Sequence, residues 1–149
     1  MAGSGWTRAA VRLLRQPAGV RRLAVVAALQ LIRASIELRL LPSRRTVALL
    51  GVVQGGALDA SVSATELRAA MDAGLIVARV ARRLPWRPTC LRQALAVRRM
   101  LHARGIPSSI HLGVTGPSAP AAHAWVTVQG QAVVGAEGME RFVPLAAFR

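Results

Sequence analysis

Apolar residues recur every three or four positions over residues 21–41, which is the pattern of a helix with a wide buried face. Pro42 cannot continue such a helix and marks its end. The pattern also predicts a shorter helix on each side of this long helix, one over residues 7–15 and one over residues 43–50. The polar, glycine-rich residues 51–63 predict a surface loop.

A second long helix is predicted over residues 64–84, where apolar side chains again follow the helical spacing. Ser63 and Glu66 stand three residues apart, as in a capping box, where each side chain binds the backbone N–H of the other residue. Gly74 lies inside this helix and costs about 1 kcal/mol relative to alanine, so a break there is an open alternative. Residues 85–88, Pro-Trp-Arg-Pro, predict a stiff connector.

The last predicted helix begins at the only cysteine of the chain. Thr89 is a residue that commonly caps a helix N-terminus, an apolar face follows it, and Gly105 supplies the end of the helix. Cys90 therefore falls in the first helical turn. The unpaired N–H groups and the helix dipole at this position favour the thiolate over the thiol.

The last third of the chain predicts a small antiparallel sheet beside the cysteine helix. Apolar and polar residues alternate over residues 110–114 and 122–128, which is the period of a strand. Gln129-Gly130 predicts a tight turn into a third strand over residues 131–134. The tail, residues 137–149, is expected to pack its apolar side chains against the rest of the domain.

The composition is that of one globular domain. Hydrophobic residues make up 53% of the 149 positions, which excludes a disordered chain. A single cysteine excludes an internal disulfide framework and argues against a structural zinc site. A free thiol fits a reducing cytoplasm, which is the expected location.

The charge is strongly basic, and it attracts acidic partners. The net charge is +14, all twenty basic residues are arginine, and aromatic residues make up only 3%. With no aromatic platform or known motif, we expect no specific nucleic-acid binding. No apolar run reaches the roughly 20 residues of a membrane span. Association with a membrane surface through the basic charge remains an alternative to a purely cytoplasmic location.

A cysteine at a helix start and a histidine in a following strand suggest a thiol nucleophile and its base. His123 lies in the predicted strand 122–128, and we expect it to deprotonate Cys90. The alternative is a buried cysteine that acts as a small hydrophobe and an unrelated histidine. Trp125 shares the strand face of His123, where it either shields the pair or packs in the core. His111 lies opposite in parity to the apolar positions and is expected at the rim.

With these residues in place, the chain resembles the transglutaminase-like proteases of lasso peptide biosynthesis, the "B-two" leader peptidases. The resemblance covers roughly residues 22–149. The segments that carry it are Cys-Leu-Arg-Gln-Ala-Leu-Ala-Val at 90–97, Arg-Gly-Ile-Pro at 104–107, His-Leu-Gly-Val at 111–114, Ala-His-Ala-Trp-Val at 122–126, Leu-Pro-Ser-Arg-Arg at 41–45 and Arg-Leu-Pro-Trp-Arg-Pro-Thr at 83–89.

The resemblance implies an α+β fold with a transglutaminase-like (papain-like) core, a Cys-His-acid triad and no cofactor. The single domain, residues 1–149, then has a helical part over 1–84 and a catalytic part over 85–149. The implied activity is a cysteine endopeptidase that removes the leader from a lasso peptide precursor. An ATP-dependent cyclase then closes the macrolactam ring. No additional recognition module is expected in the chain, so the implied leader-recognition protein is separate.

The third member of the triad is where the chain departs from the family. Family members commonly carry aspartate near the point where the turn brings the chain back opposite His123. This sequence has Gly135-Ala136-Glu137 there, which makes Glu137 the first candidate and Glu140 the second. A solvated loop carboxylate is an equal reading of Glu137, and a backbone carbonyl or water is another way to orient His123.

Two other functions remain open from the sequence. One is a different transglutaminase-like acyl transfer, such as amide cross-linking, because the sequence does not identify the acceptor. The other is a non-catalytic scaffold that presents the precursor to the cyclase. Retention of Cys90 and His123 argues against the scaffold, and the missing aspartate argues for it.

Overall fold

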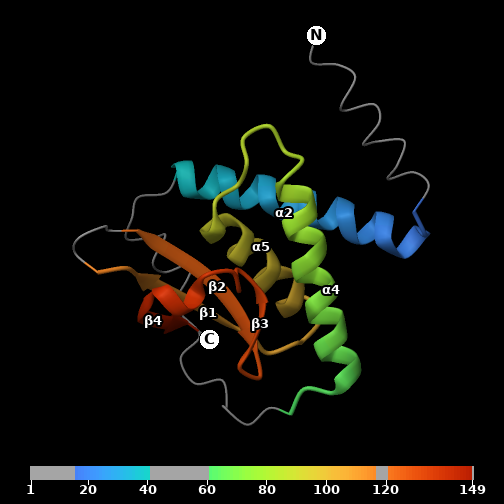
Figure 1. Ribbon diagram of the computed structural model, residues 1–149. Helices are drawn as coiled ribbons and strands as arrows, with labels where there is room; N and C mark the ends of the chain where they lie inside the picture. The colour runs from blue at the N-terminus through green and yellow to red at the C-terminus, as the bar shows by residue number, and fades with distance from the viewer. Residues whose placement is uncertain (1–15, 41–60, 117–120, 149) are drawn as a thin grey trace.

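The computed structural model describes residues 16–40, 61–116 and 121–148, and it combines three α-helices with one antiparallel sheet (Figure 1). The predicted α+β class is confirmed. The short helices expected at residues 7–15 and 43–50 lie outside the described residues, as does most of the loop expected over 51–63. The elements are α2 (Ala18–Leu40), α4 (Ala64–Ala81), α5 (Cys90–His102), β1 (Ser109–Val114), β2 (Ala122–Val128), β3 (Gln131–Val134), η1 (Met139–Arg141) and β4 (Val143–Phe148).

The sheet has the strand order β3-β2-β1-β4, and its neighbouring strands are all antiparallel. Gln129 and Gly130 have φ angles of 48° and 77°, which is the left-handed backbone of a tight turn between β2 and β3. The predicted meander of three strands is confirmed. The tail was expected only to pack against the domain, but it forms β4, which pairs with the free edge of β1 and satisfies its backbone groups.

The core lies between the three helices and one face of the sheet. Helix α5 supplies the buried side chains of Leu95, Val97 and Leu101 and contacts α2, α4 and strands β1 to β3. Small residues such as Ala27, Ala34 and Ala73 are fully buried on α2 and α4, which lets the helices approach one another closely. From β2, the side chains of Ala124, Val126 and Val128 join this core, and those of His123 and Trp125 alternate to the other face.

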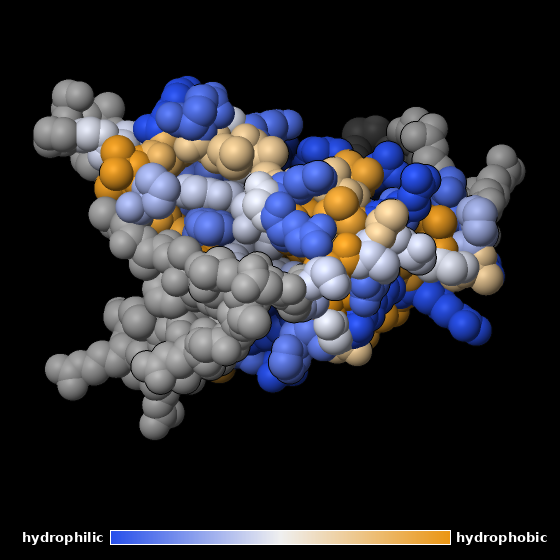
Figure 2. All heavy atoms as spheres, turned by 90° about the horizontal axis from the view of Figure 1, so that it is seen from below, coloured by the Kyte–Doolittle hydropathy of each residue, from blue (hydrophilic) through white to orange (hydrophobic). Residues whose placement is uncertain are grey.

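The outer surface carries both polar and apolar residues. Seen from below, hydrophilic residues cover much of the described surface, and smaller groups of apolar residues lie between them (Figure 2). Among the described residues, no helix has the length and hydropathy needed to cross a membrane.

Helix α4 is continuous through Gly74, so the alternative of a break is wrong. Gly74 is buried against β3, and an added Cβ would lie 1.8 Å from the carbonyl oxygen of Val133. The glycine therefore permits a close contact between helix and sheet. The predicted capping box is confirmed, because Glu66 N–H donates to Ser63 Oγ at 3.2 Å and Ser63 N–H donates to Glu66 Oε2 at 2.8 Å.

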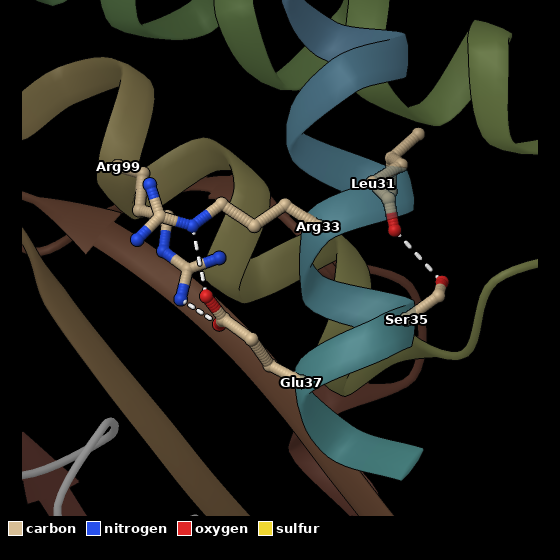
Figure 3. A network of polar contacts seen from close by, with 5 residues as sticks. All are labelled: Leu31, Arg33, Ser35, Glu37 and Arg99. Carbon is tan, nitrogen blue, oxygen red and sulfur yellow. Dashed lines mark hydrogen bonds and ion pairs between the residues drawn. The ribbon is translucent and has the colours of Figure 1, made fainter. Parts of the chain in front are cut away.

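An ion-pair network joins α2 to the cysteine helix (Figure 3). Glu37 of α2 accepts from Arg33 one turn earlier at 2.8 Å and from Arg99 of α5. Burial raises the pKa of the Glu37 carboxyl, but the hydrogen bonds from the two arginines outweigh burial, so its pKa lies below the usual value. Arg99 Nη1 is buried without a hydrogen-bond partner. Among the described residues, the carboxylate of Glu37 is therefore the group that compensates the charge of this guanidinium.

We predict that Gly74→Ala destabilises the protein by about 1–3 kcal/mol, although the same change inside an unhindered helix is stabilising. The added methyl group would collide with the Val133 carbonyl. Gly19→Ala in α2 is the matched control, because nothing lies within 4 Å of its added Cβ. Urea unfolding of both variants measures the difference. Equal effects of the two substitutions would contradict the close contact.

Glu37→Gln is expected to lower the free energy of unfolding by about 1–3 kcal/mol at neutral pH, because a charge-assisted contact to a largely buried arginine is lost. Because the folded-state pKa of Glu37 is lowered, the stabilisation is fully present at pH values above the unfolded-state pKa of about 4.3. It is lost as the pH falls through the folded-state pKa. The gap between wild type and variant should therefore close in acid.

Arg33→Ala is the control for this network, since the Arg33 side chain is 64% exposed and its ion pair is expected to contribute about 0.5 kcal/mol. Denaturant titrations at several pH values compare the two variants. A gap between wild type and Glu37→Gln that persists in acid would show that the carboxylate charge is not the source of the stabilisation.

Candidate active site

The cysteine is held at the N-terminus of α5, as the sequence predicts. Thr89 has an extended backbone, and its carbonyl accepts the N–H of Gln93 at 3.1 Å, which begins the helix. The Gln93 side chain donates to the Pro88 carbonyl at 2.9 Å and fastens the connector to the first turn. Cys90 is a free thiol, half-buried against the edge of the core.

The first turn of α5 keeps its amides available. In α4, Ser63 and Glu66 occupy the free N–H groups, but the Thr89 side chain makes no capping hydrogen bond. The N–H groups of the first helical residues have no acceptor inside a helix. Partial positive charge therefore remains at this helix start beside Cys90, where it would stabilise the oxyanion of an acyl intermediate.

The histidine is held by the main chain of the β3 end. His123 Nε2 lies 2.8 Å from the carbonyl oxygen of Gly135. A carbonyl only accepts hydrogen bonds, so this contact assigns the ring proton to Nε2 and leaves the lone pair of a neutral ring on Nδ1. This is the arrangement of a base whose other nitrogen is oriented by a neighbouring group.

Aromatic rings line the same face of the sheet. The His123 ring lies 5.9 Å from the Trp125 ring and 5.0 Å from the Phe142 ring, measured between centroids. His111 also stacks on Trp125, with 5.4 Å between the ring centroids, and its Nε2 lies 2.8 Å from Thr127 Oγ1. His111 is thus half-buried in a packed row, which is more enclosed than the rim position expected from the sequence.

Gly113 makes room for this row. It pairs with His123 across the two central strands, and an added Cβ would lie 3.0 Å from the six-membered ring of Trp125 and 2.9 Å from Phe142 Cβ. The indole can therefore lie against the backbone of β1. Trp125 is 6% exposed and stands beside His123. The indole is therefore packed and shields the histidine at the same time, so the two alternatives for Trp125 do not exclude each other.

The structure does not join the two proposed catalytic groups directly. Helix α5 contacts β2, but within the described ranges no hydrogen bond links the Cys90 thiol to the His123 ring. In proteins without bound substrate such contacts are often long and tighten in the complex. The observed partners of His123 are the Gly135 carbonyl and the two flanking aromatic rings.

The two candidate acids lie beyond this carbonyl. Glu137 is exposed in the turn after β3, and Glu140 is exposed in η1. Among the described residues, neither carboxylate forms a hydrogen bond or an ion pair with His123. The role of Glu137 stays a prediction. The sequence signal for the carbonyl is Gly135 itself, because a glycine directly after a strand marks a close approach of the backbone.

Electrostatics near the cysteine helix are dominated by arginine. Burial lowers the pKa of Arg98 on α5 from its usual value, and Arg99 is engaged with Glu37. Within residues 16–40, 61–116 and 121–148, no group of three potential metal ligands comes together.

The chain belongs to the transglutaminase-like superfamily, because the sequence model of that family matches residues 28–147. The matched range contains Cys90, His123 and Gly135 as well as the core of helices and strands, and it supports the predicted transglutaminase-like fold. This superfamily generally includes cysteine peptidases and acyl transferases. Comparisons with curated proteins and with solved structures found no significant match.

Proposed function

We propose that this protein is a cysteine endopeptidase that removes the leader from a lasso peptide precursor. The observation that carries the proposal is the helix start at Cys90 together with an oriented histidine, His123, in a chain of the transglutaminase-like superfamily. The resemblance of the cysteine and histidine segments to the leader peptidases supplies the substrate class.

In the first step, the Cys90 sulfur attacks the carbonyl carbon of the scissile peptide bond. His123 Nδ1 takes the thiol proton as the S–C bond forms, and the carbonyl oxygen becomes an oxyanion. Backbone N–H groups at the start of α5 stabilise that negative charge. When the intermediate collapses, the C–N bond breaks and the proton on His123 moves to the leaving amine.

In the second step, water attacks the thioester. His123 accepts a proton from the water, the new C–O bond forms, and the sulfur leaves with its electron pair as the carboxylic acid is released. Superfamily membership supports a second candidate, an acyl transferase, because an amine that replaces the water would form a new amide by the same steps. The fate of the thioester distinguishes the two activities.

A third candidate is a scaffold that presents the precursor without cleaving it, and the missing aspartate near His123 favours it. The proposed partners are shared by all three: the precursor, a separate leader-recognition protein and an ATP-dependent macrolactam cyclase. A cytoplasmic location suits the free thiol.

Cys90→Ala and His123→Ala should each abolish leader removal while the fold persists, because neither side chain belongs to the fully buried core. Mass spectrometry of the precursor, incubated with the protein and its recognition partner, measures the products. His102→Ala is the control, since His102 is exposed at the far end of α5 and should leave cleavage unchanged.

Each candidate function gives a different result in this assay. A hydrolysed leader supports the peptidase, a new amide to an added amine supports the transferase, and unchanged precursor with wild-type protein supports the scaffold. Normal cleavage by Cys90→Ala would refute Cys90 as the nucleophile.

We also expect the recognition partner to accelerate cleavage and added salt to weaken that acceleration. The net charge of +14 attracts acidic segments over a range that salt screens, with a Debye length of about 10 Å at 0.1 M. Cleavage rates with and without the partner, at low and high salt, test this. Equal rates in all four conditions would contradict a separate recognition protein.

A further inference from the structure

We propose that the main-chain carbonyl of Gly135 is the third member of the catalytic group, so that a Cys-His-carbonyl arrangement stands where a carboxylate would complete a triad. This inference rests on the proposed function of Cys90 and His123. Gly135 is a positioning residue in it, because its carbonyl acts on the reaction through the His123 ring.

The hydrogen bond itself has the length of a well-formed N–H to O contact. His123 Nε2 lies 2.8 Å from the Gly135 oxygen. Because a carbonyl oxygen only accepts hydrogen bonds, Nε2–H must be the donor. The bond selects the tautomer with its proton on Nε2. That tautomer presents a free lone pair on Nδ1, which a base needs to accept a proton from a thiol.

The backbone around Gly135 fixes the carbonyl in this position. Pairing of β2 with β3 runs from the tight turn to Val126 and Val134, with a shift of register, and Gly135 follows directly. Gly135 has a φ angle of 75°, in the left-handed region that disfavours other residues. An added Cβ would lie 2.7 Å from the Ala124 oxygen, so a side chain would displace the segment that carries the carbonyl.

Two aromatic rings flank the imidazole that donates this bond. Trp125 and Phe142 flank His123, and Trp125 is almost fully buried. A hydrogen bond shielded from water by apolar rings is stronger than an exposed one and is harder to replace by solvent. The part-buried hydrogen bond and the two flanking rings therefore orient the imidazole, and neither Glu137 nor Glu140, both exposed, contributes a described contact to it.

The decisive measurement is the tautomer of His123 in the wild-type protein. Nitrogen-15 NMR of uniformly labelled protein distinguishes a proton on Nε2 from one on Nδ1, and loss of the signal in His123→Ala assigns it. We expect the Nε2–H form. A proton on Nδ1 of the neutral ring would overturn the proposal, whatever the activity of the protein.

Variants then connect the bond to the rate. Gly135→Ala should lower kcat by about tenfold, as expected for a lost shielded hydrogen bond, and should mix the two tautomers while KM changes little. Gly130→Ala is the matched control, because Gly130 has nearly the same φ angle, 77°, in the same hairpin, and nothing lies within 4 Å of its added Cβ. It should share the backbone strain but keep kcat and the tautomer.

Glu137→Gln and Glu140→Gln complete the test and do not depend on whether Gly135→Ala folds. We expect both to keep kcat within about twofold of wild type, as for surface substitutions. A loss of about tenfold in Glu137→Gln would assign the role to that carboxylate and overturn the proposal. An inactive wild-type protein would refute the proposed function, and the tautomer measurement would still decide whether the carbonyl holds His123.

Discussion

The burial of α5 is the constraint on which the rest of the structure depends. Leu95, Val97 and Leu101 are at most 2% exposed, and the helix contacts both other long helices and three strands. Burying one such side chain stabilises a fold by about 1.5–3 kcal/mol. Because Cys90 is the first residue of this helix, core packing determines where the thiol lies, and a mobile loop has no part in placing it.

The elements that the sequence predicted most accurately are those whose side chains carry a local signal. The alternation over residues 122–128 and the turn at Gln129-Gly130 gave β2 and β3 their observed bounds. Thr89 and Gly105 bracketed α5 because helix ends are determined by residues within a few positions of them. Cys90 and His123 were predicted as candidate catalytic residues for the same reason, since each stands in a short segment with its own pattern.

The features that the sequence did not determine are contacts of the main chain. Gly74 suggested a break in a helix, but its missing side chain admits the backbone of β3. The strand β4 forms because β1 offers an unpaired edge. The tail itself has no clear alternation of apolar and polar residues that would predict a strand. The sequence made an acidic side chain the first candidate partner of His123 and left a backbone carbonyl as an alternative, and the observed acceptor is the carbonyl of Gly135. The pattern of side chains along a sequence does not determine which groups the backbone carbonyl oxygens contact.

Two of the acids of the chain are engaged in contacts away from His123, and this bears on the proposed role of a carbonyl. Glu37 pairs with two arginines and Glu66 completes a capping box, so two of the six carboxylates stabilise helices. A main-chain carbonyl carries no full charge and therefore stabilises a protonated imidazole less than a carboxylate does. It also has no side-chain entropy to lose, and it is not protonated near the pKa of about 4.3 at which glutamate is neutralised. In the proposed arrangement, the stabilisation of charge during the reaction would therefore fall to the helix start beside Cys90.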